Sequence, residues 1–218
     1  MDGFTGYNPV LAIYQIRNIS NYGERISTEG KSMLKTFFDE IHLAWCSPKA
    51  VEFKEKLYQL EADIFFVEYV YKNIAFDVQE ACNKHALVNG MNLINEIEEK
   101  LPIPDSGVYV SANFEEMYSA HPQTGAVGMN KRVIDQAASK FYSSILQLID
   151  MINATPCEVA LYDENGTQME DFSYLVKKQK SRIVTSLKAF SEEIVKALYD
   201  EIDVIISAKD QATTTLNS

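Results

Sequence analysis

Two long runs of helical periodicity, joined by a short turn, constrain this chain most strongly. Apolar side chains recur at steps of three, four or seven residues from Ile19 to Ala44 and again from Phe53 to Val78, which is the spacing of one helix face. Between the runs, Ser47 can cap a helix with its hydroxyl, and Pro48 suits the first helical position because the N–H that it lacks would have no partner there. The pattern predicts a helical hairpin whose second helix begins at Pro48.

The only tryptophan of the chain, Trp45, stands at the end of the first predicted helix. We expect its ring to fold over the tip of the hairpin toward Ala50 and Phe53, where the small side chain of Ala50 lets the two helices approach closely. This packing is a structural reason for a tryptophan at position 45.

The turn at 45–48 resembles that of the WxG superfamily of small helical hairpins exported by type VII secretion systems. The family pattern is a tryptophan, any residue, a glycine, then a small residue and an aromatic residue eight positions after the tryptophan; Trp45, Ala50 and Phe53 hold those places. Ser47 stands where the family has glycine, and serine suits that position if it caps a helix. The resemblance implies a partner that is a secretion-system protein or another helical-hairpin protein. Any helical hairpin with a tryptophan at its tip is the alternative.

The composition is that of a folded, acidic protein. With 218 residues, of which 46% are hydrophobic, the chain is long enough for one sizeable core. A net charge of −11 argues against nucleic acid as a partner, because no cluster of Lys and Arg is dense enough to outweigh the acidic groups. The nearest cluster is expected to be a solvated surface; it consists of Lys177, Lys178, Lys180 and Arg182.

The sequence predicts no Sec signal and no stable membrane insertion. Residues 1–7 lack the basic segment and cleavage site of a secretory signal, and the apolar run from Val10 to Ile16 is too short to span a bilayer. Cys46, Cys82 and Cys157 match no metal or redox motif and are expected to be reduced and buried. Together with the resemblance, this implies a protein that is cytoplasmic before export and is then secreted by a Sec-independent route.

The first predicted hairpin occupies residues 1–100. An irregular start to about residue 14 precedes a helix that runs to Trp45. The second helix keeps its periodicity to Cys82 and can continue to Lys100 with a kink at Asn89–Gly90. Pro102 and Pro104 then prevent helix and begin a connector, 101–128, in which 113–120 can form one or two helical turns.

The second predicted hairpin occupies residues 129–210. One helix runs from Met129 to near Asn153, and another from about Asp171 to near Lys209, with a looser tip between them that can hold a small strand hairpin within 157–169. Residues 211–218 are polar and predicted to be disordered.

Two amphipathic hairpins in one chain can cover each other's apolar faces. We therefore predict an all-α fold of four long helices, as two tandem helical hairpins packed into an antiparallel four-helix bundle. Members of the resembled family bury these faces by dimerising. Here the second hairpin, which has no tryptophan at its tip, takes the partner's place, so we expect a monomeric pseudo-dimer.

No residue pattern points to an enzyme, a metal site or a cofactor. Asp39 and His42 supply only one approach to the Glu-x-x-His spacing that a di-iron bundle needs twice. Asp163, Asn165 and Gly166 resemble part of a calcium loop, but the glycine stands at the fourth position instead of the sixth. Gly-rich phosphate loops, nucleophile elbows and Cys/His pairs are absent from the sequence. We expect a non-enzymatic protein.

Tyr199 and Asp203 form a second motif that resembles the same family. Type VII substrates carry a tyrosine, three residues and an acid after a helical hairpin, and at this spacing the ring and the carboxylate share one helix face. The resemblance implies an export signal. Two alternatives remain: Tyr199 belongs to the core beside Leu198 and Ile202, or the chain is an intracellular helical scaffold or adaptor that holds a protein ligand on the bundle.

Overall fold

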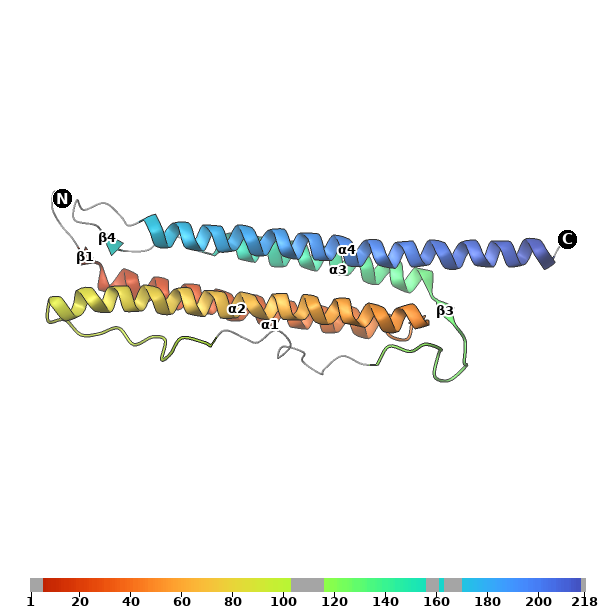
Figure 1. Cartoon of the computed structure of the whole chain (residues 1–218), viewed down its shortest axis with the longest axis horizontal. Coiled ribbons are helices and arrows are strands. Elements are labelled where there is room, and N and C mark those ends of the chain that lie inside the picture. The colour runs from red at the N-terminus through yellow and green to blue at the C-terminus, as the bar shows by residue number, and fades with distance from the viewer. Residues whose placement is uncertain (1–5, 103–115, 156–160, 163–169, 217–218) are drawn as a thin grey trace. The chain divides into compact units, whose positions relative to one another are not determined.

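The computed structural model of the protein describes residues 6–102, 116–155, 161–162 and 170–216. Within them it has four helices: α1 (Pro9–Ile41), α2 (Pro48–Val88), α3 (Lys131–Ala154) and α4 (Glu170–Leu216) (Figure 1). Four two-residue strands accompany them: β1 (Gly6–Tyr7), β2 (Trp45–Cys46), β3 (Gly128–Met129) and β4 (Leu161–Tyr162). The predicted all-α fold, with four long helices as two tandem hairpins in a helical bundle, is confirmed.

The chain forms two compact units, each of which takes one section of every helix. Unit 1 comprises Met1–Glu29, Ile64–Val108 and Leu148–Thr185, and unit 2 comprises Gly30–Asp63, Tyr109–Gln147 and Ser186–Ser218. The units therefore divide the helices along their length, and neither unit corresponds to a single hairpin.

The core of unit 1 follows the steps of three, four and seven residues seen in the sequence. Its buried apolar side chains include Ile16, Ile19, Ile26, Ile64, Val67, Tyr71, Val78, Ile149, Ile152 and Ile183. At Gly23, α1 and α2 approach so closely that an added Cβ would lie 2.7 Å from the Cβ of Tyr71. Glycine at position 23 thus permits this packing distance. In the same unit β1 pairs antiparallel with β4.

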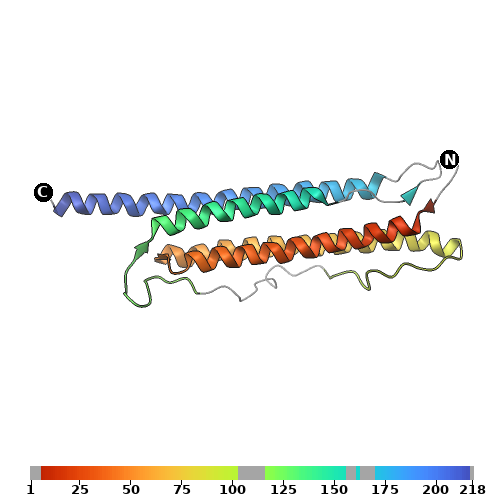
Figure 2. The ribbon, with the colours of Figure 1, turned by 180° about the vertical axis from the view of Figure 1, so that it is seen from behind.

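In unit 2, the turn at 42–47 joins sections of α1 and α2 that lie side by side in both views (Figure 1, Figure 2). The rings of Phe37 on α1 and Phe141 on α3 stack with centroids 4.3 Å apart. Other buried apolar side chains are Leu34, Phe38, Ile41, Phe53, Leu57, Leu60, Ile134, Ile145, Leu187, Ile194, Leu198 and Ile202. All four helices thus contribute to this core.

The first helix begins earlier than predicted. We expected an irregular segment to about residue 14, but α1 starts at Pro9. The Oδ1 atom of Asn8 accepts a hydrogen bond from the N–H of Leu11 at 3.1 Å, so Asn8 caps the helix. Pro9 then occupies the first helical position, where it loses no hydrogen bond.

The second helix ends earlier than its longest predicted extent. α2 stops at Val88, and Gly90 adopts a φ of +62°, a left-handed conformation that favours glycine. The N–H of Met91 bonds the carbonyl of Ala86 at 2.9 Å, which is the 6→1 bond of a Schellman end. Residues 91–101 then run back along α2 instead of continuing it to Lys100.

The fourth helix runs from Glu170 to Leu216, so residues 211–216 are helical rather than disordered. The hydroxyls of Thr213, Thr214 and Thr215 each donate to the carbonyl four residues earlier, which satisfies these side chains within the helix. No Gly or Pro interrupts the helix here.

The basic cluster on α4 was predicted to be a solvated surface, and one of its four residues differs from that prediction. Lys177, Lys178 and Arg182 are exposed, but the Nζ of Lys180 donates to the carbonyls of Asn153 and Thr155, at 2.6 and 2.8 Å. Lys180 therefore satisfies carbonyls at the end of α3.

Several predicted features lie at or beyond the edge of the described residues. In the predicted strand hairpin, Leu161 and Tyr162 pair with β1 instead, and its other residues, like Cys157 and the calcium-loop resemblance, lie outside the described ranges. Residues 116–120 are not helical, and 113–115 also lie outside the described ranges.

Among the helices described, none has an apolar stretch long enough to cross a bilayer.

We predict that Gly23→Ala destabilises the protein, by about 1–3 kcal/mol. Helix propensity alone would make this change stabilising by up to about 1 kcal/mol, so the sign is decided by the clash with Tyr71. The matched control is Asn21→Ala, an exposed position on the same helix. Urea unfolding of the two variants checks this, and a Gly23→Ala protein as stable as the wild type would contradict the close packing.

We also predict a pH dependence that originates at Cys82. This thiol is buried, and burial raises its pKa from 9.0 to about 12. Above pH 9 the unfolded thiol ionises while the folded one stays protonated, so the free energy of unfolding falls as pH rises. Between pH 8 and 10 the wild type should lose about 1 kcal/mol more stability than Cys82→Ala, measured by urea unfolding at each pH. Equal losses would contradict the raised pKa.

Candidate functional site

The turn between α1 and α2 is built from a short strand and a helix cap. The prediction that Ser47 caps α2 is confirmed, because its Oγ accepts from the N–H of Ala50 at 3.1 Å and Pro48 begins the helix. The prediction that the first helix runs to Trp45 is wrong. α1 ends at Ile41, and Trp45 lies in β2.

Strand β3 explains why the helix stops before Trp45. β2 pairs antiparallel with β3, with Trp45 opposite Met129 and Cys46 opposite Gly128. The N–H of Asn130 also donates to the carbonyl of Ala44 at 2.7 Å. Residues 128–130, just before α3, therefore supply main-chain partners that replace helical hydrogen bonds after residue 41. Both β2 residues are buried.

Trp45 packs inside the turn, as expected. Its side chain is 2% exposed, and its ring centroid lies 5.2 Å from that of Phe53 with the planes tilted by 58°, a favourable aromatic geometry. Ala50, in the first turn of α2, is also fully buried. The indole Nε1 is buried, and no hydrogen-bond acceptor for it is found among the described residues.

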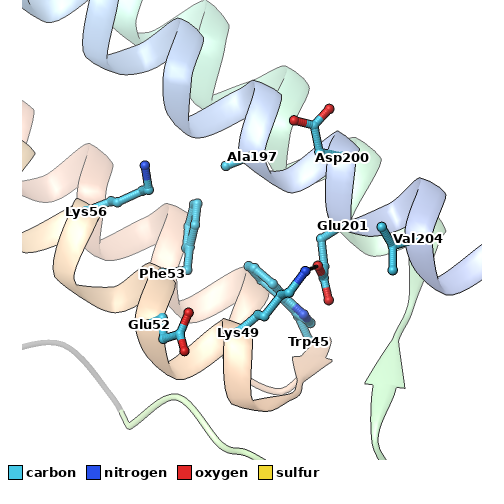
Figure 3. A pocket seen from close by; sticks show the side chains of 9 residues that line it. All are labelled: Trp45, Lys49, Glu52, Phe53, Lys56, Ala197, Asp200, Glu201 and Val204. Atoms are coloured by element: carbon cyan, nitrogen blue, oxygen red, sulfur yellow. Dashed lines mark hydrogen bonds and ion pairs between the residues drawn. The ribbon is translucent and has the colours of Figure 1, made fainter.

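A cavity of about 300 Å³ adjoins the tryptophan (Figure 3). In the close view, side chains from α2 face those from α4 across it. It is lined by Trp45, Lys49, Glu52, Phe53, Lys56, Ala197, Asp200, Glu201 and Val204. Aromatic and aliphatic groups thus lie beside charged groups of both signs, which is the composition of a site that binds an apolar side chain and orients it with polar contacts.

Ion pairs connect the two sides of this cavity. The Nζ of Lys49 lies 2.8 Å from Oε2 of Glu201, whose side chain is only 10% exposed. This hydrogen bond, and then the charge of Glu201, raise the pKa of Lys49. Lys56 also forms an ion pair, with Glu193. Glu52 and Asp200 are exposed at the cavity and appear in neither pair.

Tyr199 and Asp203 lie on the surface of α4. Tyr199 is 37% exposed and Asp203 is exposed, whereas Leu198 and Ile202 are buried. The alternative that Tyr199 is a core residue is therefore wrong. Both residues lie close enough to Lys131, at the start of α3, to add to the rise in its pKa, which is caused mainly by the hydrogen bond to Asp135.

The sequence did not identify the α4 side of the cavity. Ala197, Asp200 and Val204 recur at helical steps, but nothing in a single sequence shows what they face. Lys49 and Glu201 are 152 positions apart, so no local pattern relates them. The one signal in the sequence was that Asp200, Glu201 and Val204 lie next to Tyr199 and Asp203 along the chain.

The residues weighed as metal ligands have ordinary partners. Asp39 accepts from Lys35 Nζ at 2.9 Å, and a ring nitrogen of His42 hydrogen-bonds the carbonyl of Asp39. In the described part of the chain, no group of three or more His, Cys, Asp or Glu side chains could hold a metal ion. Cys46 and Cys82 are free and buried, as predicted.

No protein-family model, curated protein or solved structure matches this chain.

We predict that Trp45→Ala destabilises the protein by roughly 3–5 kcal/mol, because it removes a fully buried aromatic side chain. Trp45→Phe, the control, keeps most of the packing and should cost less. Chemical unfolding of both variants measures this. The native emission of the single tryptophan should also be blue-shifted, and a red-shifted emission would contradict its burial.

Proposed function

We propose that this chain is a non-enzymatic helical-hairpin protein that is exported by, or acts as a partner in, a type VII secretion system of the WxG type. It does so through protein–protein contacts, in a tandem form in which two hairpins of one chain replace a dimer. In this proposal the protein is a monomer that is made in the cytoplasm and exported by a Sec-independent route. Its partner is a secretion-system protein or another helical-hairpin protein.

The exposure of Tyr199 and Asp203 carries this proposal. The two side chains are one turn apart on α4, and both are accessible to a partner. A receptor that reads a ring and a carboxylate together needs this arrangement. The nearby Lys131 gives the same surface a positive charge beside the acid.

The Trp45 turn contributes a second contact in the proposal. Its cavity offers apolar walls at Phe53 and Val204 beside the charged groups of Lys49 and Glu201. Apolar side chains that fill a pocket on the partner contribute a large share of the binding energy at protein interfaces. We propose that a partner inserts one apolar side chain here. No catalytic group and no cofactor are assigned to the site.

We predict that the double variant Tyr199→Ala with Asp203→Ala folds normally and is not exported. Both residues are exposed, so stability should change by no more than about 0.5 kcal/mol. The melting temperature and the abundance in cells and culture supernatant are measured together in a host that carries the secretion system. The protein should accumulate in cells and disappear from the supernatant.

The matched control is Glu192→Ala with Lys196→Ala, an exposed pair of the same spacing on α4, which should be exported like the wild type. A stable Tyr199/Asp203 variant that still reaches the supernatant at the normal level would eliminate the export signal. The intracellular scaffold or adaptor would then be the better interpretation.

A further inference from the structure

Three amide side chains on α2 hold residues 91–101 by their main chain. Asn83 accepts from the N–H of Ile94 at 2.8 Å and donates to its carbonyl at 2.9 Å. Asn73 does the same with Leu101, at 2.8 and 3.2 Å. Gln79 accepts from the N–H groups of Glu96 and Ile97 and donates to the carbonyl of Ile97. We call Asn73, Gln79 and Asn83 the amide ladder; all belong to unit 1.

The amide ladder recognises a main chain and not a particular set of side chains. A side-chain amide has the donor and the acceptor of a peptide group, so each rung pairs with the segment as a neighbouring β-strand would. Peptide recognition by strand addition uses the same bonds, and side-chain pockets then add specificity. With residues 91–101 in place, Asn73 and Gln79 are 8% and 3% exposed, and their amide groups are satisfied by main-chain partners.

Few side chains of residues 91–101 take part. Ile94 is buried, at 6% exposed, while Met91 and Leu93 are 45% and 54% exposed. Two ion pairs flank the ladder. Arg17 binds Glu96 through two nitrogens, at 2.5 and 3.0 Å, and Asp77 binds Lys100 at 2.8 Å. The surface therefore fits a segment with an apolar residue at the position of Ile94. It also needs an acid two positions after that residue, as Glu96 is, and a base six positions after it, as Lys100 is.

We propose that the amide ladder, with Arg17 and Asp77, is a binding groove for an extended peptide segment of a partner protein that carries this pattern. The chain's own residues 91–101 occupy the groove until the partner replaces them. This inference is independent of the proposed export function, because none of its residues belongs to the Trp45 turn or to the Tyr199 surface.

The start of the segment is built for such an exchange. Gly90 holds the left-handed turn from which the segment leaves α2, and an added Cβ there would meet nothing within 4 Å. Movement of the segment about this residue would withdraw one core side chain, that of Ile94. Because the resident segment is tethered, it acts at a millimolar effective concentration. A partner's peptide can therefore replace it only if that peptide binds more tightly than the tethered segment, or if the contacts of the tethered segment are weakened.

The test uses a fluorescein-labelled synthetic peptide of residues 91–101 and the full-length chain. Ile94→Asp weakens the resident segment and leaves the groove intact, so the peptide should bind this variant at least tenfold more tightly than the wild type, by fluorescence anisotropy. Circular dichroism verifies that the variant is folded. A second variant, Glu96→Lys with Lys100→Glu, mispairs the two ion pairs and leaves the buried Ile94 in place. It should give the same gain if Ile94→Asp does not fold.

A control peptide isolates main-chain recognition. N-methylation at Ile94 and Ile97 removes two N–H donors but keeps every side chain, and it should abolish binding. A peptide with Glu96 and Lys100 exchanged should bind more weakly than the native one. Equal binding of the methylated peptide, or no binding of the native peptide to either folded variant, would overturn the proposal. A stable complex between the wild type and the Ile94→Asp chain would assign the groove to a second copy instead.

Discussion

The burial of Trp45 against Phe53 is the interaction on which the α1–α2 turn of unit 2 depends. The ring fills the space inside the turn, and the strand that carries it is fixed by β3 on one side and by the Ser47 cap on the other. Since β3 lies between the connector and α3, this one turn sets the end of α1, the start of α2 and the approach to α3. The same residue also lines the cavity between α2 and α4.

The sequence predicted the helices well because their apolar steps reflect burial directly. It predicted some helix ends and missed others, because a polar residue followed by proline can either begin a helix or belong to an irregular segment. Ser47 followed by Pro48 predicts a cap, while Pro9 lay within the predicted irregular start, although Asn8 and Ser47 begin their helices by the same hydrogen bond. Gly90 was interpreted as a kink, but a left-handed residue with a 6→1 bond ends a helix.

Features that depend on distant partners could not be predicted from one sequence. The strand at Trp45 requires β3, which lies more than eighty residues away along the chain, and the cavity requires α4. The amide ladder is a similar case, since Asn73, Gln79 and Asn83 look like ordinary polar residues of a helix until the segment that they hold is known. The motif residues Trp45 and Tyr199 were identified in advance, but their burial and exposure were not fixed by spacing alone.

The last turns of α4 have a different physical basis from the rest of the helix. Every residue from 206 to 216 is exposed, so no core contact holds this segment in its helical form. A helix of this length is marginal by itself in water, and it persists here because the packed part of α4 serves as its nucleus. Its turns can therefore fray and re-form without opening the core of unit 2. A molecule that lies along this segment would find a helix already started, and would lose less conformational entropy than by folding a free peptide.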